Sequence, residues 1–442
     1  MTRSNHLPSR RAFLRSSAAV AASAVAAPMI IPASALGKDG AVAPSNRIVF
    51  GCIGLGGQGR HNMGQFLGRG DCQVVALCDV DTNHRKAALT QVANRYKTEA
   101  GIGLYTDFRE LVARKDIDAV TVCTPDHWHA LASIGAANNG KDIYCEKPLS
   151  NSVAEGRAIV NAVEKNQRVL QTGSHERSGG SSRFGCELVR NGRIGKLKTI
   201  RVNLPCSDHH HQQAMKLTTM PSEQPVPAHF DYDMWLGHTA KAPYMDRRCH
   251  FWWRFVLAYG GGEITDRGAH VIDIGQLGGG FDATSLVELK ATGKRNEASL
   301  YDAFWEYEFA GKYANGVEFI GSNTGPRGVK FEGTDGWIFI HIHGGKLEAS
   351  SPAILKEKIS ENEIQLGRSP GHHQDFINAI RSRKQPIAAP EIGHRTATLC
   401  HLINIAMLTG KPLTFDPVSE KITNDAQANA MLSPVMRAPW SL

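Results

Sequence analysis

Several features that define particular classes of protein are missing from this sequence of 442 residues. Its nine cysteines form no CxxC pair, and several lie in or beside short apolar runs, so we expect small buried side chains and no disulfide framework. Lysine and arginine form no long block, which argues against a nucleic-acid partner. Beyond the N-terminal leader, no apolar run approaches the roughly 18 residues of a membrane helix. The sequence therefore predicts a globular protein with no nucleic-acid partner and no membrane span once the leader is removed.

Acidic residues are absent from residues 1–35, which hold four of the 50 lysines and arginines. Arg10 and Arg11 precede an alanine-rich apolar run at 18–31, which contains Pro28 and is too short to span a bilayer. Small residues follow at 33–35. This order is typical of a twin-arginine signal peptide, with a basic disordered tail or an organellar transit peptide as alternatives. We expect export of the folded protein to the periplasm. The remaining 46 basic and 42 acidic side chains are nearly balanced.

Short apolar runs alternate with helical stretches between residues 46 and 172. This rhythm predicts a doubly wound parallel sheet with helices on both faces, a Rossmann domain. The expected strands are 47–53, 72–79, 118–124, 142–148 and one ending near 172, and the expected helices include 85–96, 129–138 and 153–164.

After residue 172 the pattern changes, and apolar and polar residues alternate along several segments. The alternating segments are 196–204, 285–293, 303–309 and 337–343. A strand in which apolar and polar residues alternate has one buried face and one solvent-exposed face. Such strands indicate a large, mostly antiparallel open sheet, so we expect an α+β domain over 173–442. The Pro- and His-rich stretch 205–251 is long for a linker, and we expect it to wrap an active site.

The clearest motif is GLGGQG, in which Gly54, Gly56 and Gly59 lie directly after an expected strand and before a helix. These glycines turn the chain, admit a pyrophosphate and let the helix approach the strand. Asp79 ends the second strand 20 residues after Gly59, where a carboxylate accepts from a ribose 2′-hydroxyl. The motif predicts NAD as cofactor, and the nearby Arg85 leaves NADP open. The alternative to dinucleotide binding is that the glycines only form a tight turn.

A second candidate site is Cys145-Glu146-Lys147-Pro148, at the carboxyl end of an expected parallel strand. Lys147 there could hydrogen-bond a substrate oxygen beside a nicotinamide that lowers its pKa. A surface lysine paired with Glu146 is the alternative.

The third candidate is GGGEITDRGAHVIDI, residues 260–274. Asp266, His270 and Asp273 have the spacing of one helix face, so a carboxylate could orient a general-base imidazole. A buried histidine satisfied by a helical neighbour is the alternative.

Other candidates are weaker. Consecutive His209, His210 and His211 cannot easily all face one ion, so we expect no metal site. Trp253 and Arg254 could form a platform for a sugar ring, although core packing explains a tryptophan equally well.

In their order, GLGGQG, the strand-ending Asp79, TPDHWHA, EKP and GGGxxxDxGxHxxD resemble the Gfo/Idh/MocA oxidoreductases, typified by glucose-fructose oxidoreductase and inositol 2-dehydrogenase. The segments VKFEGTDGW, HHQDFINAIRSRKQPI and EIGHRTATLCHLINIA are similar to an exported subgroup of that family. The resemblance implies that Lys147 contacts the reacting hydroxyl and the nicotinamide, that His270 takes the hydroxyl proton, and that Asp266 orients substrate or histidine. It also implies cofactor contacts by Thr124, Pro125 and Glu146. We expect substrate contacts from Glu176, Arg177, Trp253, Arg254 and Asp273.

This resemblance implies an oxidoreductase that moves a hydride between a secondary hydroxyl of a sugar, cyclitol or glycoside and a tightly bound NAD or NADP. Two alternatives have precedents in the family. One is a glycosidase that works by transient oxidation and elimination, a group in which the EKP lysine is replaced; the other is a sugar-sensing protein without turnover. The resemblance also implies a homo-oligomer, a dimer or tetramer, formed through the open face of the second sheet.

Overall fold

The computed structural model describes residues 42–442. The chain divides into two units, Met1–Arg47 and Ile48–Leu442. The described part of the first unit holds one short 3-10 helix, η2 (Pro44–Asn46). The expected signal peptide at 1–35 lies outside the described residues, so its prediction stays a prediction. All further description concerns the second unit.

The second unit begins with a six-stranded parallel sheet in the order β3-β2-β1-β4-β5-β6. This is the strand order of dinucleotide-binding folds, and it confirms the predicted Rossmann architecture. Ile53 pairs with both Cys78 and Val122, so the strands end together at one edge. The strands are β1 (Ile48–Ile53), β2 (Cys72–Cys78), β3 (Gly103–Tyr105), β4 (Ala119–Val122), β5 (Asp142–Cys145) and β6 (Leu170–Thr172).

Helices cover both faces of this sheet, and each face has its own apolar core. The strands are buried on both sides, which is why they read as continuous apolar runs. The helices are α2 (Gly57–Leu67), α3 (Thr82–Tyr96), α4 (Phe108–Ala113), α5 (His129–Asn138) and α6 (Val153–Lys165).

A nine-stranded sheet follows, in the order β13-β12-β11-β7-β10-β9-β8-β14-β15. Only the β7–β10 pairing is parallel, so the prediction of a mostly antiparallel sheet is confirmed. Its strands are β7 (Leu197–Asn203), β8 (Glu288–Lys294), β9 (Glu306–Lys312), β10 (Glu318–Ser322), β11 (Gly328–Gly333), β12 (Trp337–His341), β13 (Leu347–Ala349), β14 (Leu413–Asp416) and β15 (Lys421–Ile422).

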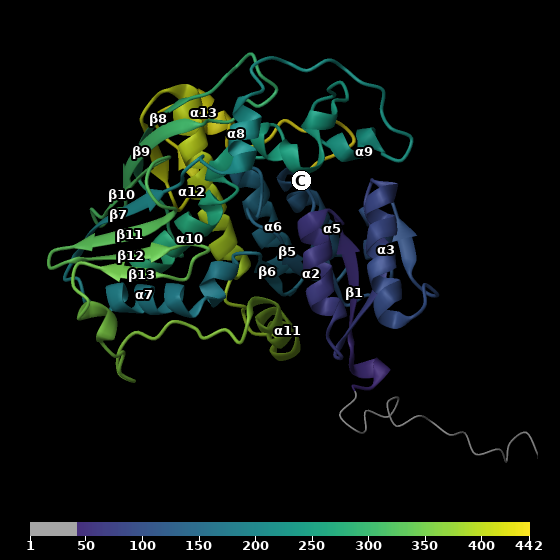
Figure 1. Cartoon of the computed structure of the whole chain (residues 1–442), viewed down its shortest axis with the longest axis horizontal. Helices are drawn as coiled ribbons and strands as arrows, with labels where there is room; N and C mark the ends of the chain where they lie inside the picture. The colour runs from purple at the N-terminus through teal and green to yellow at the C-terminus, as the bar shows by residue number, and fades with distance from the viewer. Residues whose placement is uncertain (1–41) are drawn as a thin grey trace, which may run out of the picture. The chain divides into compact units, whose positions relative to one another are not determined.

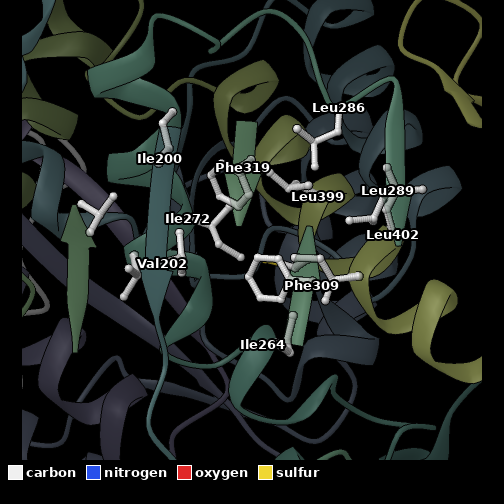
Figure 2. Packing of buried hydrophobic residues seen from close by; sticks show 14 of the residues in the cluster. Ile200, Val202, Ile264, Ile272, Leu286, Leu289, Phe309, Phe319, Leu399 and Leu402 are labelled. Atoms are coloured by element: carbon white, nitrogen blue, oxygen red, sulfur yellow. The ribbon is translucent and has the colours of Figure 1, made fainter. Parts of the chain in front are cut away.

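Helices pack on one face of the second sheet and bury a single apolar core. Figure 2 shows Ile200 and Val202 of β7 meeting Ile272 of a helix, with Phe309 and Phe319 from neighbouring strands. One helix, α12, contacts both β8 and α6, so it lies between the two sheets (Figure 1). The helices of this part are α7 (Gly180–Arg190), α8 (His209–Met215), α9 (Tyr232–Leu236), α10 (Gly268–Gly279), α11 (His372–Ser382), α12 (Pro390–Thr409) and α13 (Ala426–Ala430).

Two expected strands begin three residues later than predicted. Strands expected at 285–293 and 303–309 are found at 288–294 and 306–312. The leading residues of the second segment, Ala303 and Phe304, are buried in loop packing and not in the ladder. Apolar character alone therefore placed the strand start too early.

The Rossmann core is completed by a helix from near the C-terminus. Phe376 of α11 is fully buried among Phe50, Phe66 and Tyr144, with ring centroids 5.8–6.4 Å apart. In Figure 1, α11 lies beside α2. The segment 46–172 thus lacks part of its own core when taken alone.

All nine cysteines lie within the described residues and are free, in agreement with the prediction of unpaired thiols. Among residues 42–442, no helix has the length and apolar character needed to cross a bilayer.

Replacing Phe376 with Ala should lower the free energy of unfolding by about 3–5 kcal/mol, because it removes a buried ring and leaves a cavity in the Rossmann core. Urea denaturation measures the change. The matched control is Asn378→Ala on the exposed side of the same helix, which should change stability by less than about 0.5 kcal/mol. Equal effects of the two substitutions would show that α11 is not part of this core.

Candidate active site

A cavity of about 790 Å³ opens at the carboxyl ends of the parallel strands. Its wall includes Gly56 after β1, Asp79 after β2, Thr124 after β4 and Lys147 after β5, together with His270 of α10. Ligands of open α/β sheets bind at this edge. The cavity therefore brings residues of the first sheet against residues of the second part of the chain.

The loop between β1 and α2 has the shape that a pyrophosphate needs. Gly54 has a φ of +80°, and a Cβ on Gly59 would overlap the carbonyl oxygen of Gly54. No atom lies within 4 Å of the position that a Cβ on Gly56 would occupy, so the backbone there borders open space. No side chain caps the first turn of α2, which leaves its N–H groups available to an anion. These residues fit a dinucleotide.

The carboxylate of Asp79 stands at the position expected for ribose recognition. Its Oδ2 accepts from the backbone N–H of Leu55 at 2.7 Å, and its Oδ1 accepts from that of Asp81 at 2.8 Å. Arg85 donates to the carbonyl oxygen of Asp79 and, at 3.0 Å, to Thr82 Oγ1. The guanidinium of Arg85 is therefore engaged with protein groups.

Glu146 ties the strand end to the glycine-loop helix. Its Oε1 accepts from Asn62 Nδ2 at 2.6 Å and from Gln58 Nε2 at 3.2 Å. The sequence analysis missed both amide residues. Thr124, whose buried Oγ1 has no hydrogen-bond partner, lines the cavity with its neighbour Pro125.

Lys147 and Asp266 join the two parts of the site. The Nζ atom of Lys147 donates to Oδ1 of Asp266 at 2.6 Å and to its carbonyl oxygen at 2.8 Å. Burial alone would raise the pKa of Asp266, but Lys147 and Arg254 outweigh it and hold that pKa well below its usual range. Arg254 Nε lies 3.6 Å from the same carboxylate oxygen. The alternative of a solvated surface lysine does not hold.

His270 is buried in the cavity wall, but the helix face that it was predicted to share with Asp266 is not found. Helix α10 begins at Gly268, so Asp266 lies in the preceding turn and not on the same helix face. Burial lowers the pKa of His270 well below its usual value, and nearby Lys147 lowers it further. The imidazole is therefore held in its neutral form.

Two histidines that the sequence analysis did not select surround His270. His175 and His343 have ring centroids 4.5 and 4.9 Å from the ring of His270, and both line the cavity. They come from η4 (His175–Ser178) and from the loop after β12. No spacing in the sequence links three residues so far apart.

Three expected substrate contacts are placed outside the cavity lining. Arg177 and Asp273 form a buried ion pair, with Arg177 Nε 2.8 Å from Asp273 Oδ2, and Asp282 pairs with the same guanidinium at 2.7 Å. Glu176 accepts from the backbone N–H of His343 at 3.1 Å. The structure thus gives Arg177 and Asp273 a role in joining η4 to α10, and Glu176 a role in positioning a cavity loop.

Trp253 and Arg254 do line the cavity, with the guanidinium 4.5 Å from the indole centroid. Asp126 of the TPDHWHA motif lines it as well, and burial raises its pKa well above the usual value. Asp126 is a site residue that the motif did not predict.

The stretch 205–251, here called the covering segment, closes over the cofactor edge. Asp81 and Phe230 form an isolated bridge, supported by hydrogen bonds from Thr82 N to His229 O at 2.9 Å and from Asp231 N to Val80 O at 3.0 Å. The segment contributes several side chains to the cavity wall, as expected of a segment that wraps a site. These are His210, Phe230, Met234, Trp235, His250 and Phe251.

The three consecutive histidines have separate partners. His211 Nε2 lies 3.0 Å from Glu263, His210 Nε2 lies 2.9 Å from Arg267, and His209 bonds with Gln213. One ring nitrogen of each histidine is thus engaged with a protein group.

Two family models match the chain. The model described as "Oxidoreductase family, NAD-binding Rossmann fold" matches residues 48–174. The model described as "Oxidoreductase family, C-terminal alpha/beta domain" matches residues 186–442, more than half of the chain. Both are models of the Gfo/Idh/MocA family.

Curated relatives include a glycosyl hydrolase family 109 protein of Shewanella sp. (strain MR-4), 30% identical over 201 residues, 42% of this chain and 44% of that protein. An alpha-N-acetylgalactosaminidase of Shewanella oneidensis is 29% identical over the same length. The chain spans less than half of the length of these relatives.

Solved structures share the fold. The WlbA dehydrogenase of Bordetella pertussis, in complex with NADH and UDP-GlcNAcA, superposes with a TM-score of 0.60 at 17% identity, covering 84% of this chain and 99% of that one. The aldose-aldose oxidoreductase of Caulobacter crescentus, complexed with glycerol, gives 0.58 at 18% identity, covering 84% and 100%.

Replacing Arg177 with Leu should lower the free energy of unfolding by about 3–5 kcal/mol, because Asp273 would be left buried without its partner. Urea denaturation measures the loss, and the double substitution Arg177→Leu with Asp273→Leu should recover part of it. If Arg177 instead contacts substrate, Arg177→Leu would leave stability unchanged and raise KM.

Proposed function

Since the chain belongs to the Gfo/Idh/MocA oxidoreductase family, we propose that it is an NAD-dependent oxidoreductase that moves a hydride between a secondary hydroxyl of a carbohydrate and a tightly held nicotinamide. The carbohydrate is a sugar, cyclitol or glycoside. The names of the relatives support this substrate class, because they describe proteins that act on or bind sugars and sugar nucleotides.

The observation that carries the proposal is the fixed ammonium group of Lys147 in the cavity wall. An ammonium group has three N–H donors, and two of them are committed to Asp266. The third donor is available to a substrate oxygen. Because Asp266 fixes the direction of Nζ, the oxygen would be held at a defined place beside the glycine loop.

His270 supplies the proton acceptor. A neutral imidazole next to a cation can take the proton of a hydroxyl whose oxygen is bound by Lys147, and it can return that proton in the reverse direction. Asp266 acts by positioning Lys147 and by offsetting its charge. A nicotinamide, when bound, supplies the acceptor or donor of the hydride.

Tight retention of the cofactor is supported by the covering segment. Its backbone hydrogen bonds to Val80 and Thr82 close the edge where Asp79 would meet the ribose. Aromatic side chains of the same segment, among them Phe230 and Trp235, exclude water from the cavity wall. Release of a dinucleotide would require these contacts to open.

Export by the twin-arginine route is part of the proposal. That route carries folded proteins, so the cofactor would be loaded in the cytoplasm and would reach the periplasm already bound. A retained cofactor then needs a second carbohydrate, or the product itself, to reverse its redox state.

Homo-oligomerisation through the second sheet is proposed as well. The residues that alternate with the core positions on β7, β8 and β9 are exposed, and many are charged. A partner subunit would cover this polar face.

A second candidate function is an NAD-dependent glycosidase, which the names of the curated relatives favour. In such an enzyme the carbohydrate is oxidised transiently, an elimination expels the leaving group, and no net redox change results. The retained Lys147 and its firm attachment to Asp266 support the oxidoreductase instead.

Replacing Lys147 with Met should reduce turnover by about a hundredfold or more while the bound NAD content stays unchanged, because the glycine loop and Asp79 hold the nucleotide. The measurement combines nicotinamide absorbance during incubation with a panel of sugars and cyclitols and the NAD released on denaturation. Lys165→Met, at the exposed end of α6, is the control. Unchanged turnover in Lys147→Met would remove this residue from the mechanism, and release of an aglycone without cofactor reduction would favour the glycosidase.

A further inference from the structure

Three imidazoles from distant parts of the chain converge in the cavity wall. One ligand atom from each of His175, His270 and His343 lies within 4.8 Å of the other two. Zn–N bonds of about 2.0–2.1 Å in a tetrahedral site place two ligand nitrogens about 3.4 Å apart. The observed separations need only small side-chain movements to reach that geometry, and the exposed His175 and His343 are free to make them.

The nitrogens of this cluster are not committed to other groups. Within residues 42–442, no protein atom forms a hydrogen bond with a side-chain nitrogen of these three histidines, and Nδ1 of His270 is buried without a partner. The contact from His175 Nε2 to Glu176, at 3.8 Å, is longer than a hydrogen bond.

Two other sets of potential ligands differ in this respect. One set is Asp208, His210 and His211, whose atoms pair with Arg327, Arg267 and Glu263. The other is Asp81, His84 and His250, in which His84 Nδ1 lies 3.3 Å from Asp79.

The charged groups around the three histidines are compatible with a metal ion bound by neutral imidazoles. The positive charge of Lys147 is offset by Asp266 at 2.6 Å. Glu176 accepts a hydrogen bond from the backbone N–H of His343 and lies beside His175.

We propose that His175, His270 and His343 form a three-histidine site for a divalent transition metal, with a fourth position open to the cavity. Three histidines and one exchangeable position are a recurring arrangement for Zn²⁺. The identity of the fourth ligand rests on the proposed function: it is a hydroxyl oxygen of the carbohydrate. His270 would be a ligand in the zinc-loaded protein, and it would act as the proton acceptor of the proposed function only where no ion is bound.

The test measures Zn²⁺ binding by the purified full chain with its cofactor, without any carbohydrate. Isothermal titration should show one Zn²⁺ per chain, and X-ray absorption should show a first shell with three imidazole nitrogens at about 2.0–2.1 Å. His343→Ala and His175→Ala should each weaken binding by about tenfold or more. The control His341→Ala, on β12 and paired with Glu348, should bind as the unaltered protein does.

Zinc binding that is absent, or that survives both His343→Ala and His175→Ala, would overturn the metal site. So would binding that is lost in His84→Ala or His210→Ala, which would assign the ion to one of the other two sets. Circular dichroism of each variant shows whether a loss reflects unfolding, and the X-ray absorption shell of the unaltered protein decides the question without any variant.

The same preparations distinguish the two proposals. Carbohydrate-dependent reduction of bound NAD without zinc binding would remove the metal site and keep the oxidoreductase. Zinc binding by a chain that holds no NAD and reduces none would keep the metal site and remove the oxidoreductase.

Discussion

The ion pair between Lys147 and Asp266 is the interaction on which the rest of the site depends. It joins the end of β5 to the turn before α10, so it connects the two sheets across the cavity. Both side chains are largely withdrawn from water, and a charge left there without its partner would be costly. The pair therefore fixes the distance between the glycine loop and His270. It also leaves one lysine donor free and keeps a positive field beside a neutral imidazole.

Further contacts maintain that geometry from both sides. Glu146 anchors the helix of the glycine loop to the residue before Lys147, and the buried Arg177–Asp273 pair anchors α10 to the loop after β6. The covering segment closes the remaining side through backbone bonds to the end of β2. Each contact joins elements that are distant in sequence, so the cavity forms only when both sheets are in place.

The architecture and the central site residues could be predicted from the sequence because their signals are local. Buried parallel strands read as apolar runs, and the spacing of Gly54, Gly59 and Asp79 follows from one strand–loop–helix unit. The position of Asp266 was mispredicted because helical spacing alone does not reveal that α10 starts two residues later. The convergence of His175 and His343 on His270, and the insertion of Phe376 into the first core, depend on tertiary packing. The short strands β10, β11 and β13 were missed because partner strands, not their own sequences, define them.

The central claim is that this chain folds around a retained nicotinamide dinucleotide. Its most direct test is to purify the protein without added cofactor, denature it, and identify the released nucleotides by mass spectrometry. The account predicts close to one NAD per chain, with NAD in large excess over NADP, because the carboxylate of Asp79 would accept from a ribose 2′-hydroxyl and would repel a 2′-phosphate. A protein that releases no nicotinamide and fails to bind added NAD or NADP would contradict the account.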